Sequence, residues 1–259
     1  MKINVIYNIR STNYKDTLSQ LEEILLNRKL NFKSFELNKM EHYGDFTIVI
    51  GGDGTLLKAS KFYSEFKTPV LGVNVGRLGF LSQSQDVLSV VETILNNDFY
   101  TEERLMLQAY NKLALNDVVI KGCDPSRTSK FYLDINGKEV CDYIADGLII
   151  STPTGSTAYG LSAGGPVISP SIQAITIVPI CPHTLNARPL VIPVNETITV
   201  RTADKLLSVS IDGFENDKCI EKITIEKADR SAILAFPNSN SFYEVLRNKL
   251  HWGLSPSSY

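Results

Sequence analysis

The feature that most constrains the fold is an apolar run that ends in a glycine-rich turn. Residues Phe46–Ile50 read FTIVI, and the pentapeptide GGDGT follows at Gly51–Thr55. An unbroken apolar run of this length is typical of a strand buried within a sheet. Glycines at its end leave backbone N–H groups open to a close ligand, and phosphate is the ligand that such loops usually bind. The sequence therefore predicts a phosphate-binding turn at the tip of a buried strand.

A carboxylate in the middle of that turn indicates chemistry. Asp53 would repel a phosphate, so its presence makes sense if it holds Mg²⁺ or accepts a proton from an attacking hydroxyl. The turn is not a Walker A loop, because no Gly-Lys-Thr follows at the required spacing. Lys58, one helical turn later, either reaches a phosphate or is solvated. The turn thus predicts a phosphoryl-transfer enzyme, and a strand-to-helix turn without a ligand is the plainer alternative.

The first hundred residues alternate between strand and helix patterns. The predicted strands are Lys2–Asn8, Phe46–Ile50 and Val70–Val73. The predicted helices run from Ser11 or Thr12 to about Arg28, over Thr55–Phe62, and from Val87 to about Asn96. Such alternation predicts a parallel sheet with helices on its faces. We expect residues 1–100 to form a Rossmann-like α/β nucleotide-binding domain.

Short strand patterns dominate the chain after residue 101. They are Leu113–Ile120, Phe131–Ile135, Leu148–Ser151, Ala174–Ile180, Thr197–Arg201, Leu207–Ile211 and Ile220–Glu226. Asn136-Gly137 and Asp212-Gly213 are typical hairpin turns. We therefore expect an all-β sandwich over residues 101–234. Helical spacing returns at Phe242–His251, and residues 235–259 are predicted to pack back on the first domain.

Charge and composition exclude several kinds of partner. A net charge of −2 over 259 residues gives no general attraction to nucleic acid or to an anionic membrane, so neither is expected. Residues 1–7 read as a strand and not as a signal peptide, and no window approaches the roughly 18 apolar residues of a membrane span. We expect a cytoplasmic protein. The four cysteines and three histidines lack metal-ligand spacing, which argues against a structural zinc site.

Other polar segments stand next to predicted strands. The glycines of Gly72–Phe80 have the wrong spacing for a dinucleotide fingerprint, so this segment is expected to be a second strand-end loop. There Arg77 could face phosphate, and Phe80 either packs against a base or fills the core.

Amide, carboxylate and hydroxyl groups gather farther along the chain. Asn116 and Asp117 are neighbours, so both can reach one ligand only at a bend or strand end; a polar β-turn is the alternative. The hydroxyl- and glycine-rich run Thr152–Pro166 suits a nucleoside pocket, and it lacks the Gly-x-Ser-x-Gly elbow of a serine hydrolase.

Taken together, these segments resemble the NAD kinase family. The resemblance rests on Gly51–Thr55, Asn116-Asp117, Asp146-Gly147, Thr152–Ser162 and His183–Pro193, which follow the family's order over nearly the whole chain. The glycine loop alone is shared with diacylglycerol-type lipid kinases and phosphofructokinases. The TPTGSTAY run is much more specific.

The resemblance implies an N-terminal α/β domain, a C-terminal β-sandwich domain that binds NAD, and a homodimer or homotetramer. It implies transfer of the γ-phosphoryl group of ATP to the 2′-hydroxyl of the adenosine ribose of NAD, with Mg²⁺ or another divalent cation. Polyphosphate is an alternative donor. Asp53 is then the proton acceptor.

The predicted nucleotide-binding residues come from the loops and the resemblance together. They are Gly51, Gly52, Gly54, Thr55, Lys58, Phe80, Asn116, Asp117, Arg127, Asp146, Thr154, Thr157, Ala158, Tyr159 and Ser162. No protein side chain is assigned to the metal. The chain departs from many relatives at Ile144, where they carry a basic residue, so one phosphate or nicotinamide contact is in doubt.

Two other functions use parts of the same pattern. A lipid or sugar kinase would share the glycine loop, but the exposed apolar mouth or basic face of a lipid kinase is not evident. A non-catalytic NAD(P) sensor would bind the dinucleotide and would need no carboxylate at Asp53. Hydride transfer is disfavoured because the chain lacks a proper dinucleotide fingerprint.

Overall fold

The structure is a computed structural model that describes residues 1–76, 79–82, 86–124, 126–184, 186–204, 206–213, 215–239 and 241–253. The chain divides into two compact units. Unit 1 comprises Met1–Glu103 and Ala232–Tyr259, and unit 2 comprises Arg104–Ser231. The sequence places the divisions at 101 and 234.

Unit 1 is built on a six-stranded sheet with the order β2-β1-β3-β4-β18-β5. The strands are β1 (Lys2–Tyr7), β2 (Asn31–Glu36), β3 (Phe46–Ile50), β4 (Val70–Val73), β5 (Phe99–Arg104) and β18 (Ala232–Pro237). The pairs β1–β2, β1–β3, β3–β4 and β4–β18 are parallel. The predicted α/β class with a parallel sheet is confirmed.

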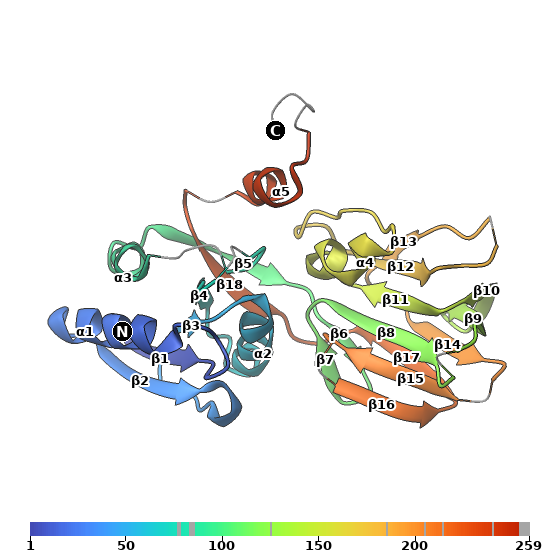
Figure 1. Ribbon diagram of the computed structural model, residues 1–259, viewed down its shortest axis with the longest axis horizontal. Helices are drawn as coiled ribbons and strands as arrows, with labels where there is room; N and C mark the ends of the chain where they lie inside the picture. The colour runs from blue at the N-terminus through green and yellow to red at the C-terminus, as the bar shows by residue number, and fades with distance from the viewer. Residues whose placement is uncertain are drawn as a thin grey trace. The chain divides into compact units, whose positions relative to one another are not determined.

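Helices cover both faces of this sheet (Figure 1). They are α1 (Tyr14–Asn27), α2 (Asp53–Tyr63) and α3 (Val87–Leu95), with short 3₁₀ turns at Leu37–Lys39 and Ser64–Phe66. A fourth helix of unit 1, α5 (Phe242–Leu250), follows β18. Leu21 and Leu25 of α1 and Val90 of α3 share one core with the side chains on one face of β1, β3 and β4. The predicted cap of α1 is wrong. The residue before that helix is Asn13, in a left-handed conformation with φ 58° and without a side-chain cap.

A buried amide fixes β3 against β1. Asn4 donates from Nδ2 to the carbonyl oxygens of Gly44 and Phe46, at 3.1 Å each, and to Thr47 Oγ1 at 3.0 Å. Its Oδ1 accepts from the N–H groups of Tyr43 and Gly44, both at 2.9 Å. Because both polar atoms of this amide have hydrogen-bond partners, the cost of burying it is offset and it can hold the strand register. The glycine loop at the end of β3 therefore starts from a fixed strand.

Unit 2 consists of two packed antiparallel sheets, as the sequence predicts. One has the order β10-β9-β14-β17-β6-β7 and the other β13-β12-β11-β8-β15-β16. The strands are β6 (Leu107–Ala109), β7 (Lys112–Ala114), β8 (Asp117–Gly122), β9 (Ser129–Ile135), β10 (Lys138–Ala145), β11 (Gly147–Ser151), β12 (Ala174–Ile180), β13 (Leu190–Pro193), β14 (Ile198–Thr202), β15 (Leu207–Ile211), β16 (Glu215–Ile220) and β17 (Lys222–Lys227). Inward side chains of both sheets, such as Phe131, Leu133 and Ile150, form one core.

The two predicted hairpin turns are present. Asn136 and Gly137, between β9 and β10, have φ 52° and 73°, and Asp212 and Gly213, after β15, have φ 49° and 72°. Two successive left-handed residues are the signature of the type I′ turn, whose twist matches that of the flanking strands. The predicted strand Leu113–Ile120 is interrupted, because β7 ends at Ala114 and β8 begins at Asp117.

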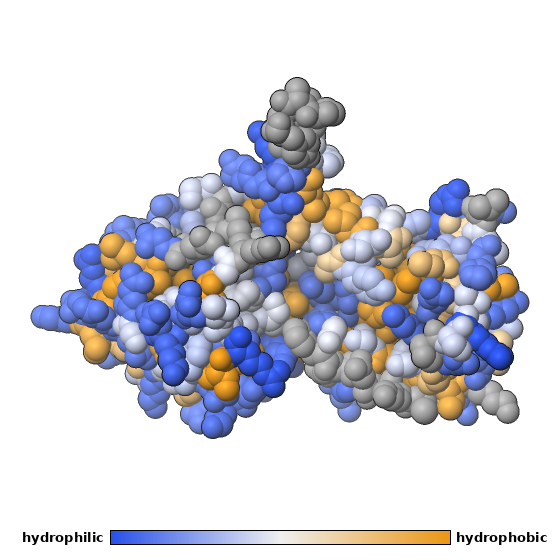
Figure 2. Space-filling model, in the orientation of Figure 1, coloured by the Kyte–Doolittle hydropathy of each residue, from blue (hydrophilic) through white to orange (hydrophobic). Residues whose placement is uncertain are grey.

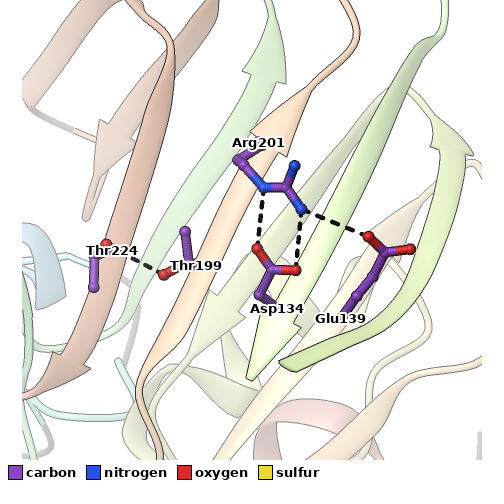
Figure 3. Close-up of polar contacts among 5 residues, drawn as sticks. All are labelled: Asp134, Glu139, Thr199, Arg201 and Thr224. Atoms are coloured by element: carbon purple, nitrogen blue, oxygen red, sulfur yellow. Dashed lines mark hydrogen bonds and ion pairs between the residues drawn. The ribbon is translucent and has the colours of Figure 1, made fainter. Parts of the chain in front are cut away.

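In unit 2, the outer face of the sheet that contains β9, β10 and β14 carries charges that pair with one another (Figure 3). Arg201 on β14 forms two bonds to Asp134 on β9, of 3.0 and 3.1 Å, and lies 3.7 Å from Glu139 on β10. Hydrophilic and hydrophobic residues are mixed on the visible surface of each unit (Figure 2). Among the described residues, no helix is long and apolar enough to span a bilayer.

Candidate active site

Three parallel strands of unit 1 end beside the glycine loop. The Gly51 N–H donates to Val73 O at the end of β4, at 2.9 Å. Asn8, which follows β1, donates from Nδ2 to Thr55 Oγ1 at 3.1 Å. A Cβ on Gly51 would lie 2.6 Å from that Thr55 oxygen, whereas one on Gly52 would meet nothing within 4 Å. The loop is therefore packed at Gly51 and open at Gly52, directly before α2, whose N-terminus favours an anion.

Asp53 is the first residue of α2, and the neighbouring loop holds its carboxylate. Oδ2 accepts from the Phe80 N–H at 2.8 Å. Oδ1 accepts from the N–H groups of Leu81 and Ser82, at 3.1 and 3.0 Å, and from the Ser82 hydroxyl at 2.9 Å. The helix begins two residues earlier than predicted, and the carboxylate is an anchor between two strand-end loops.

The other predicted residues of unit 1 lie around this loop. Lys58 is half-buried, one turn along α2. Phe80 is half-buried, and its ring centre lies 5.1 Å from Nζ of Lys249 on α5, a cation–π distance. Arg77 lies outside the described residues.

Unit 2 contains a cavity of about 490 Å³. Val118 and Ile120 of β8 point into the core between the two sheets, so the alternate residues Val119 and Lys121, which line the cavity, point to the opposite face. The cavity therefore lies on the outer face of β8 and β15. It is lined by Asn116, Asp117, Val119, Lys121, Ala158, Tyr159, Ser208, Ser210, Asp212 and Gly213. Four predicted residues, two at the start of β8 or directly before it and two from the hydroxyl-rich run, therefore meet in one cavity. That run forms a 3₁₀ turn at Thr154–Thr157 and a short helix, α4, at Tyr159–Ser162.

Two side chains that the sequence did not single out as site residues anchor the Asn116 segment. Asp212 accepts from three consecutive N–H groups, those of Leu115 at 3.0 Å, Asn116 at 2.8 Å and Asp117 at 3.1 Å. The Thr152 hydroxyl donates to Leu115 O at 2.6 Å. Neighbouring residues within a strand point to opposite faces, so both can reach one cavity only at a strand end or a bend. Asn116 and Asp117 lie at the start of β8, and both line the cavity.

The carboxylate of Asp117 is buried without a donor. Only 5% of this residue is exposed, yet within the described part of the chain no group donates a hydrogen bond to its side chain. Burial, with the Asp212 charge as a smaller cause, raises the pKa of Asp117 to about 7. Buried carboxylates are normally paired or hydrogen-bonded. A carboxylate that lines a cavity without a donor is suited to a ligand that brings hydroxyl or amino groups.

A second cavity of unit 2, of about 540 Å³, is lined by Ser126, Arg127, Thr128, Asp146 and His183. It joins the predicted residues Arg127 and Asp146. Asp146 is exposed, and Arg127 is exposed with Nε 3.9 Å from Asp124. Ile144, which stands where many relatives carry a basic residue, is 42% exposed.

The remaining predicted residues line neither cavity. Thr154 is buried and accepts from Nη1 of Arg104 at 3.3 Å. Thr157 donates to Thr154 O at 3.3 Å, and Ser162 is exposed on α4. Within the described ranges, no group of three or more His, Cys, Asp or Glu residues could hold a metal ion.

Comparison with known proteins gives a consistent result over both units. The family model of the ATP-NAD kinase N-terminal domain matches residues 5–99, and that of the C-terminal domain matches residues 115–242. A protein of Azotobacter vinelandii named NAD kinase is 37% identical, over 97% of this chain and 96% of its own. One of Geobacter sulfurreducens with the same name is 40% identical, over 81% of this chain and 79% of its own.

Solved structures show the same similarity. The crystal structure of an Archaeoglobus fulgidus NAD kinase in complex with ATP matches with a TM-score of 0.80 and 27% identity, over 95% of this chain and 97% of that one. A yeast NADH kinase in complex with NADH matches with a TM-score of 0.86 over 98% of this chain and 89% of that one. At 22% identity, the yeast match shows the fold alone.

Proposed function

The chain belongs to the NAD kinase family, and from this premise we propose the reaction that it catalyses. It transfers the γ-phosphoryl group of ATP to the 2′-hydroxyl of the adenosine ribose of NAD, which makes NADP. The observation that carries the proposal for this chain is the buried Asp117 carboxylate, which lines a cavity and has no donor within the described residues. A ribose supplies the hydroxyl donors that this carboxylate lacks.

The glycine loop of unit 1 is the proposed phosphate site. Its backbone is open at Gly52 and continues into the N-terminus of α2, an arrangement that favours phosphate oxygens. Thr55 and Lys58 add a hydroxyl and a positive charge. A ribose hydroxyl is a poor nucleophile, so a base helps: Asp53 accepts its proton as the bond to phosphorus forms. General bases contribute about 10²–10⁴-fold in rate.

The unit 2 cavity is the proposed site of the NAD adenosine. Asn116 has the donor and acceptor that match an adenine edge, and Asp117 accepts from a ribose hydroxyl. Ala158 and Tyr159 form a wall of the cavity. Thr157 and Ser162 belong to the same run but do not line the cavity, and their contact with NAD stays a prediction from the resemblance. Asp146 contacts NAD from the second cavity, where Arg127 adds a positive charge.

A divalent cation fits this arrangement as a companion of ATP. The described residues provide no cluster of carboxylates, and Mg²⁺ is usually held by substrate phosphates, water and at most one or two carboxylates. Mg²⁺ bound in this way neutralises phosphate charge during transfer.

A coupled assay tests the proposal. The protein is incubated with ATP, Mg²⁺ and NAD, and an NADP-specific dehydrogenase reports the product. Parallel reactions replace ATP by polyphosphate, or NAD by NADH, a diacylglycerol or a sugar. We expect NADP only when both a phosphoryl donor and NAD are present. Phosphorylation of the lipid or the sugar alone supports the related kinases, and tight NAD binding without NADP supports the sensor.

The assembly and location of the protein are further parts of the proposal. β10 is an edge strand on which Val140 is 49% exposed and Ile144 is 42% exposed. Such an edge is suited to burial against another copy in a homodimer or homotetramer. Light scattering coupled to gel filtration would measure the oligomer. A cytoplasmic location stays a prediction from the sequence.

A further inference from the structure

We propose that Asn74 and Ser82 are positioning residues for Asp53, and that they leave its Oδ2 as the oxygen that receives the proton. The inference rests on the proposed function, in which Asp53 is the base. It concerns residues to which neither the sequence motifs nor the proposed reaction gives a role. Asn74 and Ser82 are buried, with 3% and 0% exposed.

The hydrogen bonds around Ser82 have a defined direction. Asn74 Oδ1 accepts from the Gly76 N–H at 2.7 Å, which fixes the orientation of the amide and turns its Nδ2 away from Gly76. That Nδ2 donates to Ser82 Oγ at 3.0 Å and to Ser82 O at 3.1 Å. Because the Ser82 hydroxyl oxygen already accepts a hydrogen bond from Asn74, its own hydrogen is directed to Asp53 Oδ1, at 2.9 Å.

The two oxygens of Asp53 consequently differ. Oδ1 accepts three hydrogen bonds, from the Leu81 and Ser82 N–H groups and the Ser82 hydroxyl, whereas Oδ2 accepts one among the described residues, from the Phe80 N–H. A carboxylate oxygen has two lone pairs in the carboxylate plane. Oδ1 is fully occupied, and Oδ2 has one position left for a hydroxyl proton.

Space around the anchor is as restricted as its hydrogen bonds. A Cβ on Gly79 would lie 1.9 Å from Asp53 Oδ1, and one on Gly72 would lie 3.1 Å from Ser82 Cβ. The carboxylate, the serine and the loop backbone therefore pack without room for a second arrangement. A base held in one orientation loses less entropy when the reaction geometry forms.

Two substitutions separate positioning from folding. Ser82→Ala removes the hydroxyl, and Asn74→Asp keeps the shape of the side chain but replaces its donor by an acceptor, which turns the Ser82 proton away from Asp53. We expect kcat to fall about tenfold in the first variant and more in the second, whereas KM for NAD stays within about twofold.

Each variant has a matched control in the same unit. Ser60 lies buried on α2, and its hydroxyl has no hydrogen-bond partner among the described residues, so Ser60→Ala should leave kcat and KM unchanged. Asn4→Asp alters an equally buried amide between β1 and β3. It should lower the unfolding temperature but leave kcat per folded enzyme unchanged.

A double-mutant cycle decides the question. If Ser82 acts through Asp53, Ser82→Ala should cause no further loss of kcat in an Asp53→Asn background. A wild-type kcat in Ser82→Ala, or an equal loss in both backgrounds, overturns the inference and leaves the proposed reaction standing. A wild-type kcat in Asp53→Asn instead overturns the base itself. Should Ser82→Ala not fold by circular dichroism, the same cycle with Asn74→Asp gives the decision.

Discussion

The two units treat their principal carboxylates in opposite ways. In unit 1, Asp53 accepts four hydrogen bonds from residues 80–82. In unit 2, Asp117 is buried, has no donor among the described residues, and has a pKa raised to about 7. The chain fills most acceptor positions of Asp53, whereas the described residues fill none of the side-chain positions of Asp117 and leave them open to a ligand. Orientation is needed where a proton must move, whereas an unsatisfied acceptor is needed where a substrate must be recognised.

The ion pairs of Arg201 with Asp134 and Glu139 differ from the contacts of both Asp53 and Asp117. Its partner Asp134 is held by a bidentate contact on an exposed sheet face (Figure 3). Exposed pairs of this kind contribute about 0–1 kcal/mol and carry no catalytic demand. The contrast identifies an acceptor position left open by the described residues as the property that Asp53 and Asp117 share, whereas only Asp117 is buried.

The largest effect should follow from Asp53→Asn. The amide keeps the shape of the side chain but cannot accept the proton, so we expect turnover to fall by about 10²-fold or more. NAD affinity should stay within about tenfold, because the proposed adenosine site lies in unit 2. The coupled NADP assay and isothermal titration with NAD measure the two quantities. Unchanged turnover would remove the functional difference between the two carboxylates.

Asp117→Ala should chiefly weaken NAD recognition. A hydrogen bond to a charged group is worth about 1.5–3 kcal/mol, which corresponds to a rise of about 10–100-fold in KM for NAD. The loss in kcat should be smaller than that of Asp53→Asn. Steady-state kinetics at varied NAD test this expectation, and a loss confined to kcat would contradict it.

Gly79→Ala should displace the Asp53 carboxylate from its anchor without changing the carboxylate chemically. Its Cβ would lie 1.9 Å from Oδ1, so the carboxylate or the loop has to move. We expect kcat to fall about tenfold and stability to fall by about 1–3 kcal/mol. Kinetics and urea denaturation measure the two effects. Full activity in this variant would show that the anchor can shift freely.

The pH dependence of stability gives the most local test. The folded pKa of Asp117 is about 7, above its usual value, so the folded state holds this proton more tightly than the unfolded chain does. Stability should therefore fall as pH rises from about 4 to 7 and level off above that range. Asp117→Asn should remove this contribution and, at pH 8, raise the free energy of unfolding by roughly 2–4 kcal/mol. Parallel curves for both proteins would contradict the raised pKa.

The central strands could be predicted from the sequence because burial on both faces makes them continuously apolar. β3 and β4 have the predicted bounds. The edge strands β2 and β10 escaped prediction, since neither is continuously buried and both mix charged with apolar residues. β18 was also missed, because its partner β4 lies far away in the sequence.

The site residues that could be predicted are likewise those marked by local sequence motifs, and the residues that were missed are those defined by contacts between distant segments. The glycine loop and the Asn116-Asp117 pair are local signals. Asp212 read only as a hairpin turn, because the N–H groups that it binds are 95 to 97 residues away. The anchoring of Asp53 by residues 80–82 is likewise a tertiary contact. Sequence patterns therefore indicate the reacting and ligand-binding residues more readily than the residues that fix their positions.

One close approach in unit 2 limits how the proposed adenosine pocket could change. A Cβ on Gly155 would lie 2.1 Å from Asn116 O, and the Thr152 N–H already donates to that oxygen at 2.9 Å. The hydroxyl-rich run and the start of β8 are thus one rigid piece. A chain of this design could acquire a different nucleobase preference by exchanging outward side chains such as Tyr159 or Ser210, but not by lengthening or re-routing the run itself.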